Sequence, residues 1–353
     1  RNTLIACFQD TQQRAVSNKL RDCTQLAILS SKVYKEGYVS GRPHSNYDIL
    51  RPYTAPHTTF AEAKRYVGKG RIAVLNFANP ETPGGGVQNG AMAQEECLCR
   101  SSNLYPCLTV PNVQKEYYEY HRRKANHFFS DRLIYTKDVT VFKSDDPIPQ
   151  LLPEEEWFTV DVITCAAPYI AKRKHTNLPA LKNLFISRIK NIFEVAVENQ
   201  VDFLILGAFG CGAFKNPPEV VASAFDAVIF SEMYRCAFKE IAFAIKPTKV
   251  PEMQCPNFKT FYVEFMRLPV NEGEEVVEIP GLISPTGVTI PPIKYINHIN
   301  GNISCSVNLC LSAVKESIGR GYNSPEYSNQ NTESIAVDFL KWQINNLYYK
   351  KQF

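Results

Sequence analysis

The sequence predicts an α/β fold in which helices cover both faces of a sheet. From about residue 70, short apolar stretches alternate with longer stretches of helical period. Several of the apolar stretches are continuous, as in buried central strands. The 353 residues, 44% of them hydrophobic, are also enough to bury a large core.

Five strands are expected in this region, at residues 71–79, 133–142, 160–168, 201–210 and 241–247. Apolar residues recur at helical spacing over residues 178–200, between the third and fourth strands. A second stripe of the same period, from Val220 to Ile229, follows the fourth strand. Strand and helix therefore alternate, and residues 254–267 are expected to close the core with a final helix.

The two ends of the chain differ from this core, which is expected to span residues 71–267. Residues 1–70 are predicted to be mostly helical, with a loop at 44–57, and to form a helical addition to the core. The charged, proline- and glycine-rich residues 271–292 fall in a C-terminal extension of unknown role, residues 268–353. A strand at 304–314 and an amphipathic helix at 334–351 are expected there.

Composition and charge narrow the functional class. The net charge of +4 is mild for this length, so direct nucleic-acid binding is not indicated, although a small anionic ligand is compatible with it. No apolar run is long enough to cross a membrane, and the first residues do not resemble a signal peptide, so we expect a soluble intracellular protein.

The eleven cysteines predict free thiols in a reducing compartment, cytoplasmic or nuclear, because their number is odd and no C-x-x-C pair occurs. Cys97 and Cys99 could form half of a metal site, but the histidines lie far away in the sequence. We therefore expect neither a metal nor a cofactor.

The first informative motif follows the strand at 71–79. Three glycines, Gly84 to Gly86, let the backbone approach a ligand without a Cβ in the way. Gln94, Glu95 and Glu96 come next and can start a helix whose positive end lies near the two acids. Taken separately, a flexible turn and ordinary helix-start acids remain alternatives to a site.

The second motif is the segment 207–214, GAFGCGAF, between the fourth strand and a helix. Asn216 fits the N-cap of that helix, with Pro217 at its first position and Glu219 in a capping box. A glycine-rich loop that meets a helix start is suited to binding phosphate. Phe209 and Phe214 could be core residues or could flank a ribose or base. Cys211 is better explained as a packing residue than as a nucleophile, since no histidine is nearby.

Together these motifs are specific. The order N-F-A-N-P-x-x-P-G-G-G-V, Q-E-E, R-S-S-N-L-Y and L-G-A-F-G-C-G-A-F-x-N-P-P resembles the microbial-type poly(ADP-ribose) glycohydrolase family over residues 1–267. The resemblance implies a macrodomain-like mixed sheet sandwiched by helices. It also implies that Glu96 is the catalytic general acid/base and that Glu95 holds a ribose hydroxyl. The ADP-ribose-binding residues that it implies are Asn79, Gly84, Gly85, Gly86, Val87, Gln94, Phe209, Gly210, Cys211, Gly212, Ala213 and Phe214, and residues 164–168 are expected to line the cleft.

The function that the resemblance implies is hydrolysis of ribosyl O-glycosidic bonds in poly(ADP-ribose), which releases ADP-ribose. Neighbouring acids lie about 100° apart around a helix, so we expect Glu96 alone to act as acid and then as base. The alternatives are a mono-ADP-ribosyl hydrolase that acts on modified protein or nucleic acid, or a module that binds ADP-ribose without cutting it. The intact Q-E-E favours an enzyme. Two basic runs, 121–124 and 172–175, either contact a polyanionic chain or form a solvated face.

Overall fold

The computed structural model describes residues 1–265, except 46, 49, 51, 125, 126, 146, 174, 248 and 249, and the backbone of 274–279, 282–283, 289–290, 293–298 and 303–304. The chain divides into two compact units, Arg1–Phe265 and Met266–Phe353. The strand expected at 304–314, apart from residue 304, and the helix expected at 334–351 lie outside the described residues.

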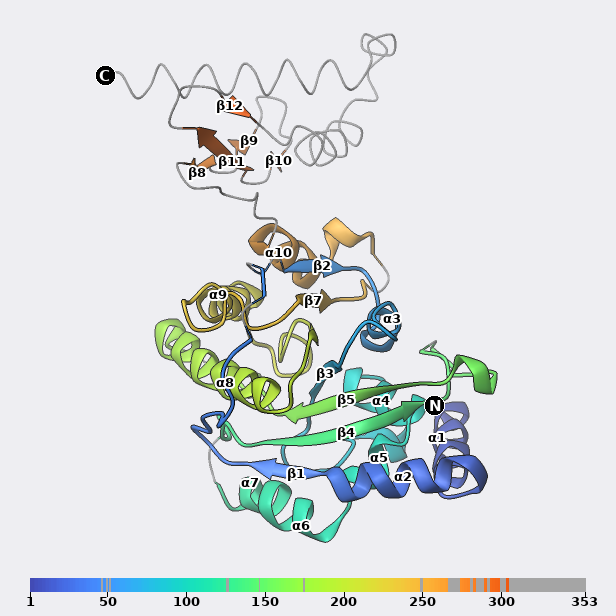
Figure 1. The fold of residues 1–353 in the computed structure, drawn as a ribbon. Coiled ribbons are helices and arrows are strands. Elements are labelled where there is room, and N and C mark those ends of the chain that lie inside the picture. The colour runs from blue at the N-terminus through green and yellow to red at the C-terminus, as the bar shows by residue number, and fades with distance from the viewer. Residues whose placement is uncertain are drawn as a thin grey trace, which may run out of the picture. The chain divides into compact units, whose positions relative to one another are not determined.

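The first unit is built on a seven-stranded mixed sheet of order β1-β4-β5-β3-β6-β7-β2 (Figure 1). β4 is antiparallel to both of its neighbours, and the strands from β5 to β2 are parallel. All five expected strands are present, so the predicted mixed α/β sheet is confirmed. The strands are β1 (Lys32–Tyr34), β2 (Tyr53–Ala55), β3 (Ile72–Phe77), β4 (Leu133–Val141), β5 (Phe158–Cys165), β6 (Phe203–Leu206) and β7 (Glu240–Ala244).

Helices cover both faces of this sheet. The central strand β3 alternates between them: Ala73 and Leu75 pack into one apolar cluster, and Ile72 and Val74 into the other. The first cluster is completed by α8 (Leu178–Glu198), α9 (Pro218–Ile229) and α10 (Pro256–Phe265), the three helices that the sequence predicts. The other helices of this unit are α1 (Asn2–Ala15), α2 (Asn18–Ser30), α3 (Thr59–Lys64), α4 (Gln94–Ser101), α5 (Leu104–Leu108), α6 (Pro111–Val113) and α7 (Glu119–Arg123), with a π-helical turn at Gln114–Tyr118 and 3-10 turns at Val87–Asn89, Glu154–Glu156 and Glu252–Gln254.

Residues 1–70 do more than add helices to the core. They supply β1 and β2, the two edge strands, as well as α1, α2 and α3. The expected loop at 44–57 contains β2, which pairs in parallel with β7. Each edge strand has only three residues, which is too short to show a period in the sequence.

The second unit contains short antiparallel strands. β8 (Glu274–Ile279), β11 (Ile293–His298) and β12 (Ile303–Ser304) form one sheet, and β9 (Leu282–Ile283) pairs with β10 (Thr289–Ile290). β8 therefore lies within the charged, proline- and glycine-rich residues 271–292, where the sequence predicts no strand.

Candidate active site

A cavity of about 620 Å³ lies at the carboxyl ends of the parallel strands. Its walls come from the segments that follow β5, β3, β6, β7 and β2, together with the start of α4. The carboxyl edge of such a sheet is where α/β proteins bind ligands. Nine of the residues singled out in the sequence line it: Asn79, Gln94, Glu95, Glu96, Phe209, Gly210, Gly212, Ala213 and Phe214.

The first turn of α4 brings two buried carboxylates to this cavity. Glu95 is 3% exposed and Glu96 7%. The backbone N–H of Asn79 donates to Glu95 Oε2 at 2.7 Å, and that of Gly86 donates to Glu96 Oε1 at 2.8 Å. The second oxygen of Glu96, Oε2, is buried and has no hydrogen-bond partner among the described residues. Asn76 Nδ2 also donates to Glu95 Oε1 at 3.4 Å. The described residues therefore bind both oxygens of Glu95 but only one oxygen of Glu96.

The glycine run makes room for these acids. Gly84 and Gly85 have φ of +66° and +56°, in the left-handed region that favours glycine. A Cβ at position 85 would stand 2.5 Å from Glu96 Oε1 and 3.1 Å from Glu95 Oε2. The run therefore lies against the carboxylates, and both acids reach the same glycine although they are neighbours on one helix.

Gln94 and Asn79 fix the two ends of the segment 79–94, which joins β3 to α4. Gln94 Oε1 accepts from the Phe77 N–H at 2.9 Å, and its Nε2 donates to the Leu75 carbonyl at 2.7 Å, which ties the start of α4 to the end of β3. Asn79 Oδ1 accepts the N–H groups of residues 81 and 82, both at 2.9 Å. These polar side chains hold the loop in shape.

Burial raises the pKa of Glu95 to about 8. This value already includes the negative charge of Glu96, which also raises the pKa, and the hydrogen bonds from Asn79 and Asn76, which lower it. At neutral pH the Glu95 carboxyl therefore holds its proton for most of the time, so the two acids together carry less than two negative charges.

The loop after β6 forms another wall of the cavity. Gly210 has φ of +74°, and a Cβ there would meet Ala167 at 2.4 Å, whereas a Cβ on Gly212 would have nothing within 4 Å. Phe209 is fully buried and packs near Phe77 and Phe185, which makes it a core residue that also borders the cavity. Phe214 is half-buried.

The predicted cap of the following helix is wrong. α9 begins at Pro218, with Pro217 at the N-cap position. The Asn216 side chain instead donates to the carbonyls of Pro168 at 2.8 Å and Gly210 at 2.9 Å. It therefore joins the loop after β6 to the end of β5, a long-range contact that a helix-start pattern does not reveal.

Five of the expected ligand residues do not line the cavity: Gly84, Gly85, Gly86, Val87 and Cys211. The Val87 side chain is fully buried in the core. Cys211 packs against the other apolar cluster, and burial raises the pKa of its thiol far above its usual value, which agrees with a packing role. Of the segment 164–168, only Ala167 borders the cavity.

Several lining residues have no signal in the sequence. His57, Thr58 and Thr59 follow β2, Lys246 follows β7, and Asn257 lies on α10. His57 Nδ1 lies 2.6 Å from Oε2 of Glu62, whose carboxylate is fully buried and also bonded to the Tyr53 hydroxyl. These residues lie together because β2 pairs with β7, and no local pattern predicts that pairing.

Within the described parts of the chain, no three His, Cys, Asp or Glu side chains gather closely enough to hold a metal ion. None of the described helices has the length and apolar character needed to cross a membrane.

Comparisons with known proteins point to one family. The family described as microbial-type PARG, catalytic domain, matches residues 3–144. A search of curated proteins gave no match. The crystal structure of poly(ADP-ribose) glycohydrolase from Thermomonospora curvata is 27% identical, with a TM-score of 0.66, over 75% of this chain and 100% of that one.

Two ligand-bound structures are similar as well. The Thermomonospora curvata enzyme bound to the inhibitor ADP-HPD is 28% identical, with a TM-score of 0.63, over 74% of this chain and 98% of that one. The poly(ADP-ribose) glycohydrolase of Deinococcus radiodurans in complex with ADP-ribose is 31% identical, with a TM-score of 0.63, over 70% of this chain and 99% of that one. The chain therefore belongs to the microbial-type poly(ADP-ribose) glycohydrolase family, a family of glycohydrolases.

Proposed function

We propose that this chain hydrolyses the ribosyl O-glycosidic bonds of poly(ADP-ribose) and releases ADP-ribose, with Glu96 as the only general acid/base. The observation that carries this proposal is the buried, unpartnered Glu96 Oε2 at the wall of the cavity. A buried polar atom without a partner is costly unless a ligand completes its hydrogen bonding. The similar structures bound to ADP-ribose and to ADP-HPD support a ligand of this kind.

In the proposed reaction, protonated Glu96 gives its proton to the oxygen that leaves as the bond to the ribose C1 breaks. The ribose then carries oxocarbenium character, which the negative diphosphate nearby stabilises. The Glu96 carboxylate takes a proton from water as the water oxygen attacks C1. Glu96 ends in its starting state, and one water has been consumed.

The surroundings of Glu96 support a single-residue mechanism. Glu95 has both oxygens held by Asn79 and Asn76 and reaches the same glycine as Glu96, so it is not placed to act from the opposite side of the bond. We assign Glu95 to hold a ribose hydroxyl. The loop 209–214, with its open Gly212, holds the diphosphate, and Asn79, which lines the cavity, contacts the distal ribose.

The test is Glu96→Gln, which keeps the shape of the side chain but removes its acid/base chemistry. Turnover of poly(ADP-ribose) should fall by roughly 10²–10⁴. Affinity for ADP-ribose, measured by calorimetry, should stay close to that of the parent protein. Glu81→Gln is the matched control. Glu81 lies in the loop that precedes α4, but its side chain is exposed and does not line the cavity.

Two outcomes would overturn the proposal. If Glu96→Gln cuts poly(ADP-ribose) as fast as the parent, Glu96 is not the catalytic group. If the parent binds ADP-ribose but releases none from polymers or singly modified proteins, the chain is a reader of ADP-ribose. Release from singly modified proteins alone would indicate a mono-ADP-ribosyl hydrolase.

A further inference from the structure

Beside the cavity lies a group of cations that the proposed reaction does not use. They are Arg122, Arg123 and Lys124, around the end of α7, and Lys172 and Arg173, after β5; we call these five residues the basic rim. All are exposed except Lys124, which is half-buried. Positive charge is therefore concentrated locally in the basic rim, although the net charge of the whole chain is only +4.

The first part of the basic rim contacts the segment 79–94, which joins β3 to α4. Arg122 Nη1 donates to the backbone carbonyl of Glu81 at 2.5 Å. Glu81 lies between Asn79, which is bonded to Glu95, and Gly85, which lies against both acids. The basic rim therefore starts next to the loop that surrounds the carboxylates.

The second part starts at the wall of the cavity that the loop after β6 forms. The N–H of Ile170 donates to the Phe214 carbonyl at 3.1 Å, and the rings of Tyr169 and Phe214 are 5.2 Å apart, edge to face. Phe214 itself lines the cavity. Lys172 and Arg173 follow within four residues of Tyr169.

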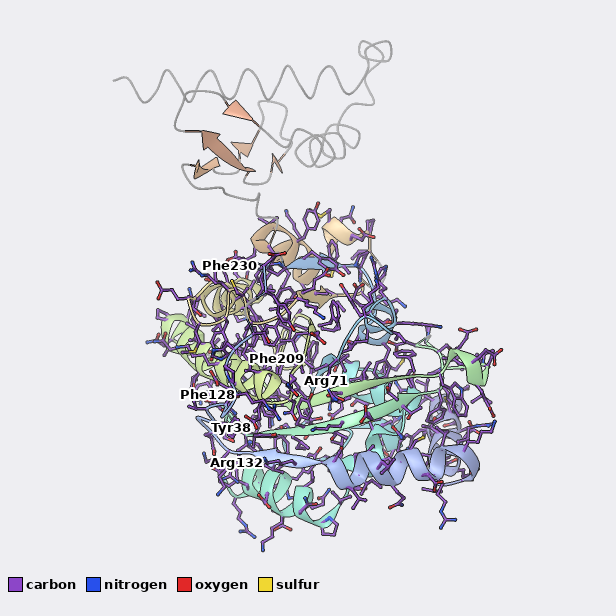
Figure 2. The ribbon with its side chains drawn as sticks, in the orientation of Figure 1. Tyr38, Arg71, Phe128, Arg132, Phe209 and Phe230 are labelled. Carbon is purple, nitrogen blue, oxygen red and sulfur yellow. The ribbon has the colours of Figure 1, made fainter. Side chains whose placement is uncertain are left out.

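Two partly exposed aromatic side chains, Phe128 and Tyr169, lie beside the second part. The Tyr169 N–H donates to the His127 carbonyl at 2.8 Å, and the Arg173 guanidinium lies 3.9 Å from the centre of the Phe128 ring. In Figure 2, Phe128 lies nearer the edge of the molecule than Phe209 does. Phe128 and Tyr169 are both half-exposed, so cations and aromatic faces alternate along this surface.

Most of the charge on the basic rim is not neutralised by the protein. Arg123 pairs with Glu119 at 3.1 Å, and Lys124 with Glu36 at 3.6 Å. Arg122, Lys172 and Arg173 form no ion pair with any described carboxylate. Exposed cations that repel one another and lack internal partners are suited to an external polyanion.

We propose that the basic rim binds the part of poly(ADP-ribose) that continues beyond the scissile bond. This inference rests on the proposed function, because the remaining polymer starts at the oxygen beside Glu96. Each further unit carries a diphosphate for the arginine and lysine side chains and an adenine that can stack on Phe128 or Tyr169. The enzyme then holds one unit in the cavity and the next units on the basic rim.

The experiment compares long and short ligands. Polymer of about twenty units and single ADP-ribose are titrated against the Glu96→Gln protein, in which the polymer stays intact, with and without Lys172→Ala and Arg173→Ala. Counterion release at about 0.7 per phosphate contact predicts a loss of roughly 10- to 25-fold in polymer affinity near 0.1 M salt, and a slope of log affinity against log salt that is smaller by about 1.4. ADP-ribose affinity should change less than about twofold, which also reports correct folding.

The matched control removes the same charge from α2, no residue of which lines the cavity, as Lys19→Ala with Arg21→Ala. It should leave polymer affinity unchanged. The proposal fails if the two double variants behave alike, or if single-stranded DNA of equal charge competes as well as the polymer, which would indicate a general polyanion surface. These binding results do not depend on turnover, so they are distinguishable from a failure of the parent protein to cut the polymer.

Discussion

At the level of single residues, environment separates two acids that are chemically the same and adjacent in sequence. Glu95 and Glu96 are both nearly buried and both lie against Gly85. Glu95 uses its oxygens to accept hydrogen bonds from the protein, whereas Glu96 has one oxygen, Oε2, that is buried without a partner among the described residues. The difference in available oxygen atoms, and not residue type, is the reason why we propose Glu96 as the catalytic acid.

The titration of Glu95 makes a prediction about stability. Because burial raises its pKa to about 8 from 4.5, folded Glu95 keeps a proton that the unfolded chain loses between these values. Its contribution to the free energy of unfolding is therefore complete below pH 4.5 and is lost as pH rises towards 8. In the parent, the free energy of unfolding should therefore decrease between about pH 5 and 8, and Glu95→Gln should remove roughly 3 kcal/mol of this decrease. Urea unfolding at several pH values measures it.

Glu81→Gln again serves as the control, because an exposed glutamate should leave the pH dependence of stability unchanged. An identical slope of stability against pH in the parent and in Glu95→Gln would contradict the raised pKa.

At the level of elements, the two glycine-rich loops use glycine for different reasons. In the loop before α4, Gly85 has a positive φ and no space for a Cβ, because the acids fill it. In the loop after β6, Gly212 has open space around it. The first loop is shaped by the protein itself, and the second leaves room for a ligand.

Gly212→Val should therefore fold as well as the parent and bind ADP-ribose roughly tenfold or more weakly, since the added side chain occupies the space for the diphosphate. Calorimetry gives the affinity, and thermal unfolding gives the stability. Unchanged affinity in the folded variant would remove this loop from the site.

Gly85→Ala should behave in the opposite way at the level of folding. The left-handed backbone costs alanine about 1–2 kcal/mol, and its Cβ meets Glu96 Oε1 at 2.5 Å. The melting temperature and the turnover should both fall. A variant as stable and as active as the parent would show that the loop can move away from the acids.

The sequence predicts the long elements well and the long-range contacts poorly. The five strands, α8, α9 and α10 are visible because each is long enough to show a period or a continuous apolar run. β1 and β2 are not, because three residues carry no period. For the same reason the sequence does not identify His57 and Lys246 as cavity residues, since the pairing of β2 with β7 brings them to the cavity. The Q-E-E acids could be found, because their motif is contiguous.

At the level of the whole molecule, every described residue that lines the cavity belongs to the unit Arg1–Phe265. We therefore propose that residues from 268 onward are an accessory segment. A chain that stops near residue 268 should fold and keep its turnover of poly(ADP-ribose) within about twofold of the full chain. Circular dichroism and release of ADP-ribose are the measurements, and an unfolded or inactive truncation would show that the extension completes the core or the cleft.

The parallel pairing of β2 with β7 also bears on how the protein is made. Tyr53 of β2 pairs with Ala242 of β7, so this early edge strand has no partner during synthesis until almost the whole first unit has left the ribosome. Closing the large loop between β2 and β7 is slow, because the chain loses conformational entropy before the stabilising contacts form. A nascent chain arrested before residue 240 carries both acids of α4 but lacks β7, the strand that pairs with β2 and so brings His57 to the cavity. The two acids are therefore synthesised long before their cavity is complete.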